Sequence, residues 1–394
     1  MLKLLYITGL YPPPETANGI RAYYFVRELV RSGYDVTVLE TVSRADPSVG
    51  GFFGERVIRL PLRSRSTLAR MYDILYKVFF VRDRVKEMLS EEKLDLVVAT
   101  WPSHEAIVLG GLLSRDLRIP LVVDIQDLSD YYSEIGSRST PIALMSLYRW
   151  IYGIIGRADK IVTVTEPFRK ILEVRTGRKD IEVVYNGVDA ELYGEALRKI
   201  LRREVREPPV GVFVGDLNWR YHMLDRFIIA LAMLKRVSSK NPTKLRIVGI
   251  GAMIRKYREL VDRLNLSEAA SFEGYLERGE LVSTLVTADY GIIGRPSINN
   301  PWNVASVRTT LYEYIAAGLP IFAFGPKKSY IKTLLDVNKC GYYVQYDDPL
   351  VIAENLEKFL GLLKSFDRKT IHERSYRYNW PTLAKQFVEI IRGI

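Results

Sequence analysis

The sequence predicts an α/β protein made of two similar halves, each a parallel sheet covered by helices. Near the N-terminus, a buried strand over 2–8, a turn-rich loop over 9–19, a helix over 20–32 and a strand over 35–39 form a βαβ unit. A second alternation of strands and helices begins at residue 210. With 394 residues, the chain is also too long for a single hydrophobic core, which favours two domains of ordinary size.

The composition is typical of a globular protein and favours an anionic partner. Hydrophobic residues make up 48% of the chain, and 57 Lys and Arg against 46 Asp and Glu leave a net charge of +11. The basic residues are spread along the chain without an aromatic RNA-binding signature or a basic recognition helix, so specific nucleic-acid binding is not expected. One cysteine excludes an internal disulfide, and three scattered histidines add no zinc pattern, so no metal site is expected.

Four more strands are predicted in the first half, at 94–100, 121–125, 160–165 and 181–185. The first loop of such a sheet usually faces the ligand, but the loop over 9–19 lacks G-x-G-x-x-G, which argues against a nicotinamide cofactor. Asp127 follows the strand over 121–125, at a carboxyl strand end where such folds place their chemistry. A plain turn cap is the alternative interpretation of Asp127.

The second half repeats the pattern after residues 190–208, a charged stretch that we interpret as a linker. Its predicted strands lie at 210–214, 244–248, 270–273, 288–293 and 321–324. Its predicted helices lie at 223–237, 254–264 and 280–287, and a final amphipathic helix is predicted over 376–394.

The rest of the chain is organised around residues 306–320, SVRTTLYEYIAAGLP. Thr310 followed three residues later by Glu313 predicts a helix that starts with a capping box, and Gly318 predicts its end. The helix follows a loop rich in Arg, Pro and Asn, and a helix N-terminus behind such a loop can hold an anion. Arg295 and Arg308 would add full positive charge, although a simple helix cap explains the same spacing.

Over nearly the whole chain, these motifs resemble the family 4 glycosyltransferases of the GT-B fold. The matching segments of the second half are FVGDL (213–217), LRIVGIG (245–251), ASFEGYL (270–276), TADYGIIGRPS (287–297) and LYEYIAAGLPIFAF (311–324). Those of the first half are residues 4–40, QDLSD (126–130) and YNGVDAELY (185–193). The chain most resembles the bacterial and archaeal branch that builds cell-surface polysaccharides and glycolipids.

The resemblance implies two Rossmann-like domains that face each other across a cleft, over 1–195 and 205–375, with a final helix over 376–394 that returns to the first domain. The second domain would hold a nucleotide-diphosphate sugar, and the first a polysaccharide, lipid-linked or other glycan acceptor. Members of the family transfer the sugar with retention of configuration, mainly by stabilising the departing diphosphate with fixed positive groups. No metal or other cofactor is usually needed.

Individual roles follow from the same resemblance. Glu313 would accept hydrogen bonds from the ribose hydroxyls, and the amides of Ser306, Val307 and Arg308 would meet the diphosphate. Gly19 would let the backbone approach the donor phosphate.

Asp127 would face the sugar or the acceptor. Two positions depart from the family pattern, because Ala305 replaces the first glutamate of a pair and Asp216 replaces an arginine that meets the diphosphate. Either Arg220 or His222 stands near an expected lysine. The positive charge is therefore expected from three arginines, Arg220, Arg295 and Arg308.

Two stretches of the first half bear on membranes. Residues 64–90 interleave apolar and aromatic side chains with Arg and Lys, a pattern typical of helices that lie on anionic membranes, although core packing is the alternative. Residues 140–156 are mostly apolar, but Arg149 argues against a membrane span. We expect a cytoplasmic protein docked peripherally on the inner face of the cell membrane.

Two other functions stay open. A nucleotide-sugar epimerase of the same architecture would bind the donor without a second substrate. A non-catalytic binding subunit is favoured by Asp216 and Ala305. A hydride-transfer enzyme fits least, because neither half carries the dinucleotide glycine fingerprint.

Overall fold

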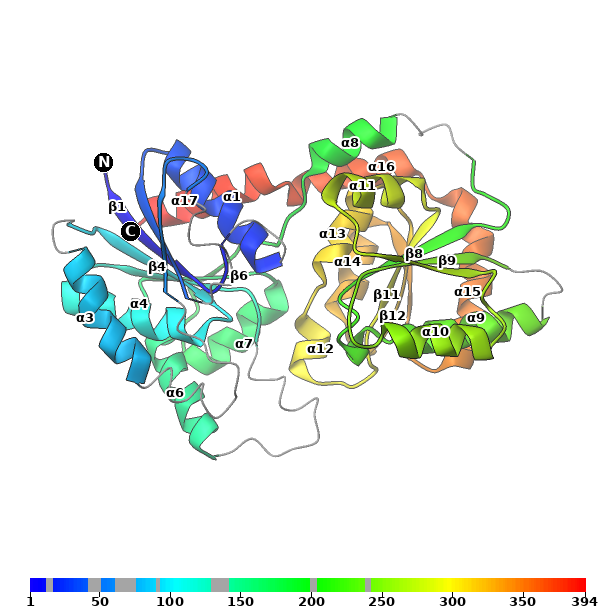
Figure 1. Ribbon diagram of the computed structural model, residues 1–394, viewed down its shortest axis with the longest axis horizontal. Helices are drawn as coiled ribbons and strands as arrows, with labels where there is room; N and C mark the ends of the chain where they lie inside the picture. Colours follow the sequence, from blue (N-terminus) through cyan, green and yellow to red (C-terminus); the bar gives the residue numbers. More distant parts are fainter. Residues whose placement is uncertain are drawn as a thin grey trace. The chain divides into compact units, whose positions relative to one another are not determined.

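The computed structural model confirms the α/β class, with two Rossmann-like domains each built on a parallel sheet (Figure 1). It describes residues 1–11, 17–41, 51–60, 76–89, 93–128, 142–198, 204–237 and 242–394. The chain forms two compact units. Unit 1 comprises Met1–Asn186 with Trp380–Ile394, and unit 2 comprises Gly187–Asn379.

The sheet of unit 1 has, in the described ranges, seven parallel strands in the order β3-β2-β1-β4-β5-β6-β7. The strands are β1 (Lys3–Thr8), β2 (Asp35–Glu40), β3 (Arg56–Arg59), β4 (Leu96–Trp101), β5 (Leu121–Ile125), β6 (Lys160–Thr163) and β7 (Ile181–Val183). The helices are α1 (Ala17–Arg31), α3 (Val78–Met88), α4 (His104–Leu117), α6 (Ile142–Gly156), α7 (Glu166–Thr176) and α17 (Trp380–Arg392). Helices cover both faces, so β4 and β5 are buried at every position, and their sequences are apolar apart from Thr100 and Asp124.

The C-terminal helix α17 packs against α1 within unit 1, on the same face of the sheet (Figure 1). Phe25 of α1 stacks on Phe387 with ring centroids 4.1 Å apart, and Tyr24 stacks on Trp380 at 5.2 Å. The helix begins at Trp380, after a 3₁₀ turn over Ser375–Tyr378, rather than at 376. The chain therefore completes unit 2 before it adds this last layer to unit 1.

The sheet of unit 2 has six parallel strands within the described residues, in the order β10-β9-β8-β11-β12-β13. The strands are β8 (Val210–Val214), β9 (Lys244–Val248), β10 (Ala270–Gly274), β11 (Tyr290–Gly294), β12 (Ile321–Phe324) and β13 (Gly341–Val344). The helices are α8 (Ala190–Arg198), α9 (Leu224–Val237), α10 (Ile254–Arg263), α11 (Arg278–Thr287), α12 (Pro301–Ala305), α13 (Thr309–Ala316), α14 (Tyr330–Asn338), α15 (Pro349–Leu362) and α16 (Arg368–Arg374). One large core joins α9, α10 and α15 to the sheet.

Helix α8 corrects the predicted linker over 190–208. Ala190, Tyr193 and Leu197 are buried, and their spacing of three and four residues is enough to seat a helix on unit 2. Charged residues dominate the same stretch, which hid this apolar stripe. The boundary between the units accordingly falls after Asn186, earlier than the expected limits of 195 and 205.

Helix α13 differs from the prediction at its start and agrees at its end. Its N-cap is Arg308 without a side-chain cap, and Thr310 Oγ1 instead donates to the carbonyl of Val214 at 3.5 Å. Glu313 bonds to other helices, so the predicted capping box is wrong. Gly318 ends the helix with a φ of 65°, and the following amide of Leu319 donates to the carbonyl of Tyr314.

The basic stretch over 64–90 lies partly outside the described residues, and α3 covers its later part. Val78 and Val85 are buried, whereas Phe80 is 80% exposed. Arg82 and Lys86 approach Asp116 of α4 to 3.5 and 3.8 Å. Among the described helices, none combines the length and the hydropathy needed to cross a bilayer.

Candidate functional site

The candidate site lies at the carboxyl ends of β8 and β11, where the strand order of unit 2 changes direction. The chain runs from β8 to β9 and β10 on one side, and β11 to β13 follow on the other. Loops from two neighbouring strands diverge at such a switch point, which makes it the usual ligand site of a parallel sheet. Three polar side chains lie close together there, namely His222, Arg295 and Arg308, and Ser306 precedes Arg308 by two residues in the same loop.

Arg308 places a guanidinium directly beside the end of β8. Its Nη2 donates to the carbonyl of Val214 at 2.5 Å, and the group lies over the ring of Phe213 at 5.1 Å. This approach requires glycine at 215, because a Cβ there would lie 2.3 Å from Nη2. Arg308 is 8% exposed, and its Nη1 has no hydrogen-bond partner among the described residues. One donor of this fixed cation is therefore unused.

Arg295 and His222 complete the polar lining. The Arg295 guanidinium lies over the rings of Tyr221 and Trp302, at 5.4 and 4.7 Å. His222 is buried, and neither ring nitrogen makes a hydrogen bond within the described part of the chain.

The charge states of the cluster are set by burial. Burial, and then the charges of Arg308 and Arg295, hold the pKa of His222 well below its ordinary value, so the imidazole is neutral at pH 7. Burial is also the main reason that the pKa of Arg308 falls to about 10, which leaves the guanidinium charged at pH 7. The cluster thus holds two cations beside a neutral imidazole.

This arrangement is suited to an anion that carries several oxygen acceptors. Two buried cations repel each other, and a negative charge between them offsets both that repulsion and their loss of water. Ser306 follows α12, and its buried Oγ also has no hydrogen-bond partner in the described residues. Guanidinium, imidazole and hydroxyl donors together match a phosphate or diphosphate group.

Two other predicted donor residues lie on the same segment. Val307 is half-buried between Ser306 and Arg308. Glu313 lies further along α13, where its Oε1 accepts a hydrogen bond from Arg278 of α11 at 2.8 Å and its Oε2 accepts one from Tyr193 of α8. The carboxylate is thus held between three helices, with lone pairs left on both oxygens.

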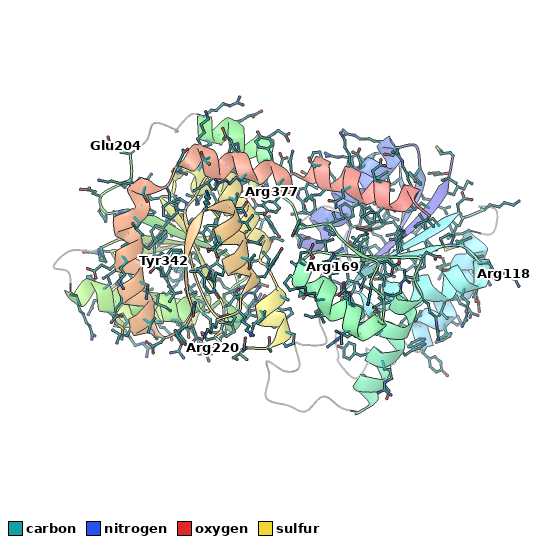
Figure 2. All side chains as sticks on the ribbon, turned by 180° about the vertical axis from the view of Figure 1, so that it is seen from behind. Arg118, Arg169, Glu204, Arg220, Tyr342 and Arg377 are labelled. Atoms are coloured by element: carbon teal, nitrogen blue, oxygen red, sulfur yellow. The ribbon has the colours of Figure 1, made fainter. Side chains whose placement is uncertain are left out.

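Arg220 lies apart from the cluster, although it is only two residues from His222. Its side chain is 74% exposed and approaches Asp225 to 3.3 Å (Figure 2). Burial raises the pKa of Tyr257 on α10 to about 12, and the charge of Arg220 partly offsets that rise, whereas Arg308 and Arg295 are the cations that act on His222. Of the two candidates for the expected lysine, His222 therefore lies at the switch point.

Gly19 and Asp127 belong to unit 1. Gly19 is buried in the first turn of α1. Asp127 follows β5, and its Oδ1 accepts a hydrogen bond from the amide of Leu128 at 2.7 Å. This contact agrees with the turn-cap interpretation.

Asp216, which replaces an arginine of the family pattern, bonds within its own loop. Its Oδ1 accepts hydrogen bonds from the backbone and side-chain amides of Asn218, and its Oδ2 accepts one from the indole of Trp219 at 3.1 Å. The sequence interpretation also missed the aromatic wall of Trp219, Tyr221 and Trp302. The dense run N-W-R-Y-H after β8 was the available signal.

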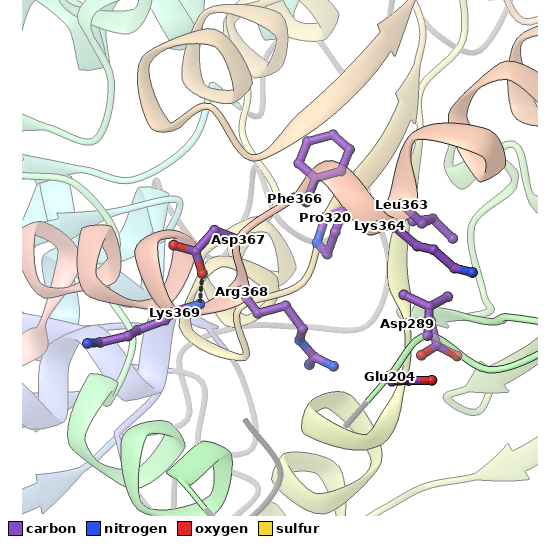
Figure 3. Close-up of a pocket in the computed structure, with 10 residues that line it drawn as sticks. Glu204, Asp289, Pro320, Leu363, Lys364, Phe366, Asp367, Arg368 and Lys369 are labelled. Atoms are coloured by element: carbon purple, nitrogen blue, oxygen red, sulfur yellow. Dashed lines mark hydrogen bonds between the residues drawn. The ribbon is translucent and has the colours of Figure 1, made fainter. Parts of the chain in front are cut away.

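A separate cavity of about 540 Å³ lies at the other end of the sheet of unit 2 (Figure 3). Asp289 and Pro320, which line it, precede β11 and β12. Its central cation, Arg368, donates to the carbonyls of Val286, Ala288, Ala317 and Gly318 and thereby closes the ends of α11 and α13. Asp289 accepts from the amide of Val210. These polar groups serve the fold, which favours the switch point as the functional site.

Two family models together cover most of the chain. The model described as Glycosyltransferase Family 4 matches residues 19–192, and the model described as Glycosyl transferases group 1 matches residues 196–371. The chain belongs to the family 4 glycosyltransferases. The resemblance stated from the motifs is thus confirmed across both halves.

Curated relatives match this family 4 chain over part of their length. The D-inositol 3-phosphate glycosyltransferase of Corynebacterium urealyticum is 27% identical over 263 residues, which is 61% of this chain and 58% of that protein. The uncharacterised glycosyltransferase MJ1059 of Methanocaldococcus jannaschii is 24% identical over 54% of this chain and 52% of its own. The chain spans between 37% and 58% of the length of the curated relatives it matches.

Solved structures share the fold over the full chain. Sucrose-phosphate synthase from Thermosynechococcus elongatus superposes with a TM-score of 0.79 at 17% identity, covering 100% of this chain and 99% of that one. HepE of Anabaena, solved in complex with UDP-glucose, gives a TM-score of 0.69 at 17% identity with both chains covered completely. At these identities the likeness establishes the GT-B fold.

Proposed function

We propose that this family 4 glycosyltransferase takes a nucleotide-diphosphate sugar at the switch point of unit 2. It would transfer the sugar, with retention of configuration, to a hydroxyl of a glycan or lipid-linked acceptor. The observation that carries the proposal is the buried cluster of Arg308, Arg295, His222 and Ser306, which presents donors to an anion. The UDP-glucose bound by HepE, a protein of the same fold, supports this class of donor.

The nucleoside half of the donor would lie toward Glu313. Arg278 and Tyr193 fix the carboxylate, and its remaining lone pairs can accept hydrogen bonds from two ribose hydroxyls. The diphosphate would then lie at Arg308, which begins the same helix.

The positive cluster would act mainly on the leaving group. When the bond between the anomeric carbon and the phosphate oxygen breaks, its electron pair stays on the diphosphate. Arg308 and Arg295 stabilise that growing charge, and fixed cations in a buried site do so without reorganisation. The acceptor oxygen forms the new bond to the anomeric carbon, and its proton passes to the departing phosphate oxygen. Neutral His222 can donate one further hydrogen bond there.

Other roles rest on the family resemblance alone. We propose that Gly19 admits the donor phosphate to the backbone, that Asp127 orients the acceptor, and that Val307 contributes its amide to the diphosphate. Arg220 keeps a proposed supporting charge, but its pairing with Asp225 gives it the smallest expected part.

Membrane docking is proposed for unit 1 through α3. Tyr76 and Phe80 are 67% and 80% exposed, and the exposed Arg84 lies one turn beyond Phe80. Flotation with anionic and with neutral vesicles tests this, and replacing Phe80 by Ser should reduce flotation with the anionic ones only. Equal flotation of the two proteins would count against docking by α3.

Product analysis tests the proposed function. The protein is incubated with UDP-, GDP-, ADP- and TDP-sugars together with a lipid and oligosaccharide acceptor extract, and products are analysed by mass spectrometry and NMR. A new glycoside with the anomeric configuration of the donor, with free nucleotide in equal amount, is the expected result. An isomerised sugar nucleotide would identify an epimerase, and nucleotide binding without turnover would identify a binding subunit.

A further inference from the structure

The loop between β8 and α9 carries an exposed tryptophan beside the positive cluster. Trp219 is 53% exposed, yet its indole N–H is fixed by a hydrogen bond to Asp216 at 3.1 Å. Exposed aromatic rings are common on protein surfaces, but this one is held in place by a charged acceptor. This ring is held in a defined orientation with much of its surface open.

The loop that carries Trp219 is itself anchored. The amide of Leu217 donates to the carbonyl of Ile250 at 2.9 Å, and the side chain of Asn218 accepts from the amide of Ala252 at 2.8 Å. Gly251 allows this packing, because a Cβ there would lie 2.2 Å from the carbonyl carbon of Leu217. The aromatic ring is therefore presented on a loop fixed to its neighbour rather than on a free one.

Contacts between rings lead from Trp219 to the positive cluster. The ring centroid of Trp219 lies 6.0 Å from that of Tyr221, which lies 4.3 Å from His222 and 5.3 Å from Trp302. Arg295 lies over both Tyr221 and Trp302. A ligand group attached to an anion in the cluster would come within reach of the indole.

The position of Glu313 indicates which part of a bound donor would lie beside Trp219. Glu313 is held by Arg278 of α11 and Tyr193 of α8, whereas Trp219 belongs to the ring cluster that includes Trp302 of α12. With the ribose at Glu313 and the diphosphate at Arg308, the sugar is the part of the donor left for the indole. The apolar C–H face of a pyranose is a suitable partner for an aromatic ring.

We propose that Trp219, oriented by Asp216, is a stacking platform for the sugar ring of the donor. This inference rests on the proposed function, because it requires a nucleotide sugar at the switch point. It also assigns a role to Asp216, which departs from the family pattern. Asp216 acts as a positioning residue through the indole and does not meet the diphosphate.

The test compares the affinity of the full-length protein for a nucleotide sugar with that for the matching nucleoside diphosphate, such as UDP-glucose and UDP or GDP-mannose and GDP. The Trp219→Ala variant should bind the sugar conjugate about three- to tenfold more weakly, which is the usual contribution of an aromatic contact. Its affinity for the nucleoside diphosphate should stay the same. Trp219→Phe keeps a ring but lacks the N–H that Asp216 holds, and Asp216→Ala keeps the indole but removes its acceptor. Both variants should therefore fall between wild type and Trp219→Ala, with the loss again confined to the sugar conjugate.

Tyr346→Ala is the matched control, because Tyr346 is 57% exposed in the loop after β13 and makes no part of the ring cluster described above. Unfolding temperatures of all variants check the fold, and Trp219→Phe and Asp216→Ala retain a test if Trp219→Ala unfolds. Equal losses for diphosphate and conjugate, or no loss for either, would overturn the platform. If wild type binds neither ligand, the proposed function itself fails, and that result is distinct from both.

Discussion

The two units use the same sheet topology and fill their switch points with opposite chemistry. The switch point of unit 1 lies between β1 and β4. Most of the polar side chains there carry hydroxyl groups, and one carries a carboxylate. Thr100 donates to Thr8, Thr41 bonds to Ser103, and Ser103 donates to Glu105, which is 1% exposed. The switch point of unit 2, between β8 and β11, carries arginines instead.

The buried arginines of the two units differ in how many of their donors have hydrogen-bond partners. Arg21 of unit 1 is fully buried, but it bonds Asp124 through two nitrogens at 2.8 and 2.9 Å and also donates to the carbonyl of Tyr185. Arg308 of unit 2 bonds one carbonyl and keeps Nη1 unused. A buried arginine with a complete set of partners stabilises the fold, whereas one with an unused donor is suited to a ligand.

Removing Arg21 should give the largest effect, and the effect should be on stability. Arg21→Ala leaves the buried Asp124 without its cation, which typically costs about 3–5 kcal/mol. Thermal unfolding should show a fall of roughly 10 °C, while donor affinity of the protein that stays folded is unchanged. Replacing both residues, as Arg21→Met with Asp124→Leu, should restore most of the loss. Loss of donor binding at an unchanged unfolding temperature would show that this arginine serves a ligand as well.

Arg308→Ala should have the next largest effect, on turnover. A fixed cation that stabilises the departing diphosphate is typically worth about 10²–10³ in kcat, and the loss should exceed the loss in donor affinity. Steady-state kinetics and titration with the nucleoside diphosphate measure the two quantities. Arg220→Ala tests the proposed supporting charge and should change kcat by less than about twofold, because its side chain is exposed and paired with Asp225. Equal losses in kcat and affinity would point to a plain ground-state contact.

Glu313→Gln should weaken donor binding about five- to tenfold, the usual scale of a lost hydrogen bond to a charged group. Tyr193→Phe removes one partner of Glu313 but keeps the carboxylate, so its effect on donor affinity should be smaller. Calorimetric titration with the nucleoside diphosphate compares the variants. If Glu313→Gln and Tyr193→Phe weakened binding equally, Glu313 would act only through the packing of α8. That result would contradict the proposed contact between Glu313 and the ribose.

His222 should give the smallest effect, a loss of stability in acid. Its pKa is lowered in the folded protein, so below its ordinary value near 6.5 the unfolded chain binds a proton that the folded chain does not. The free energy of unfolding should therefore decrease as the pH falls from about 6.5 to 5.5, by about 1 kcal/mol from this residue. Urea titrations at both pH values should show a smaller decrease for His222→Asn. The same decrease in both proteins would mean that His222 is not held neutral.

The sequence predicted most strands because they are short apolar runs between turn formers, but it missed β3 (RVIR) and β13 (GYYV), the half-buried strands at the edges of the two sheets. The strand over 121–125 and those over 210–214, 244–248 and 321–324 were placed with the observed bounds. Helix α8 was missed because its stripe holds only Ala190, Tyr193 and Leu197 in a highly charged stretch. Local composition conceals such a helix until tertiary packing shows which face is buried.

The sequence did not reveal which of the candidate side chains point into the site. Arg308 and Arg295 were expected near the ligand, and they lie close together at the switch point, with Ser306 in the loop that leads to Arg308. Arg220 and His222 belong to one 3₁₀ turn, where the turn alone sends one side chain to the surface and the other inward, and spacing does not reveal which. The partners of Asp216 were equally hidden, since a carboxylate near an expected diphosphate gives no sign that an indole will bind it.

The central claim is that Arg308, His222 and the neighbouring polar groups at the switch point of unit 2 bind the diphosphate of a nucleotide. It is tested most directly by thermal unfolding of wild type and Arg308→Ala with UDP, GDP, ADP and TDP. At a hundred times its dissociation constant, the correct nucleotide should stabilise wild type by about 2.7 kcal/mol, a rise of several degrees, and Arg308→Ala far less. No rise with any nucleotide, or the same rise in both proteins, would contradict the account.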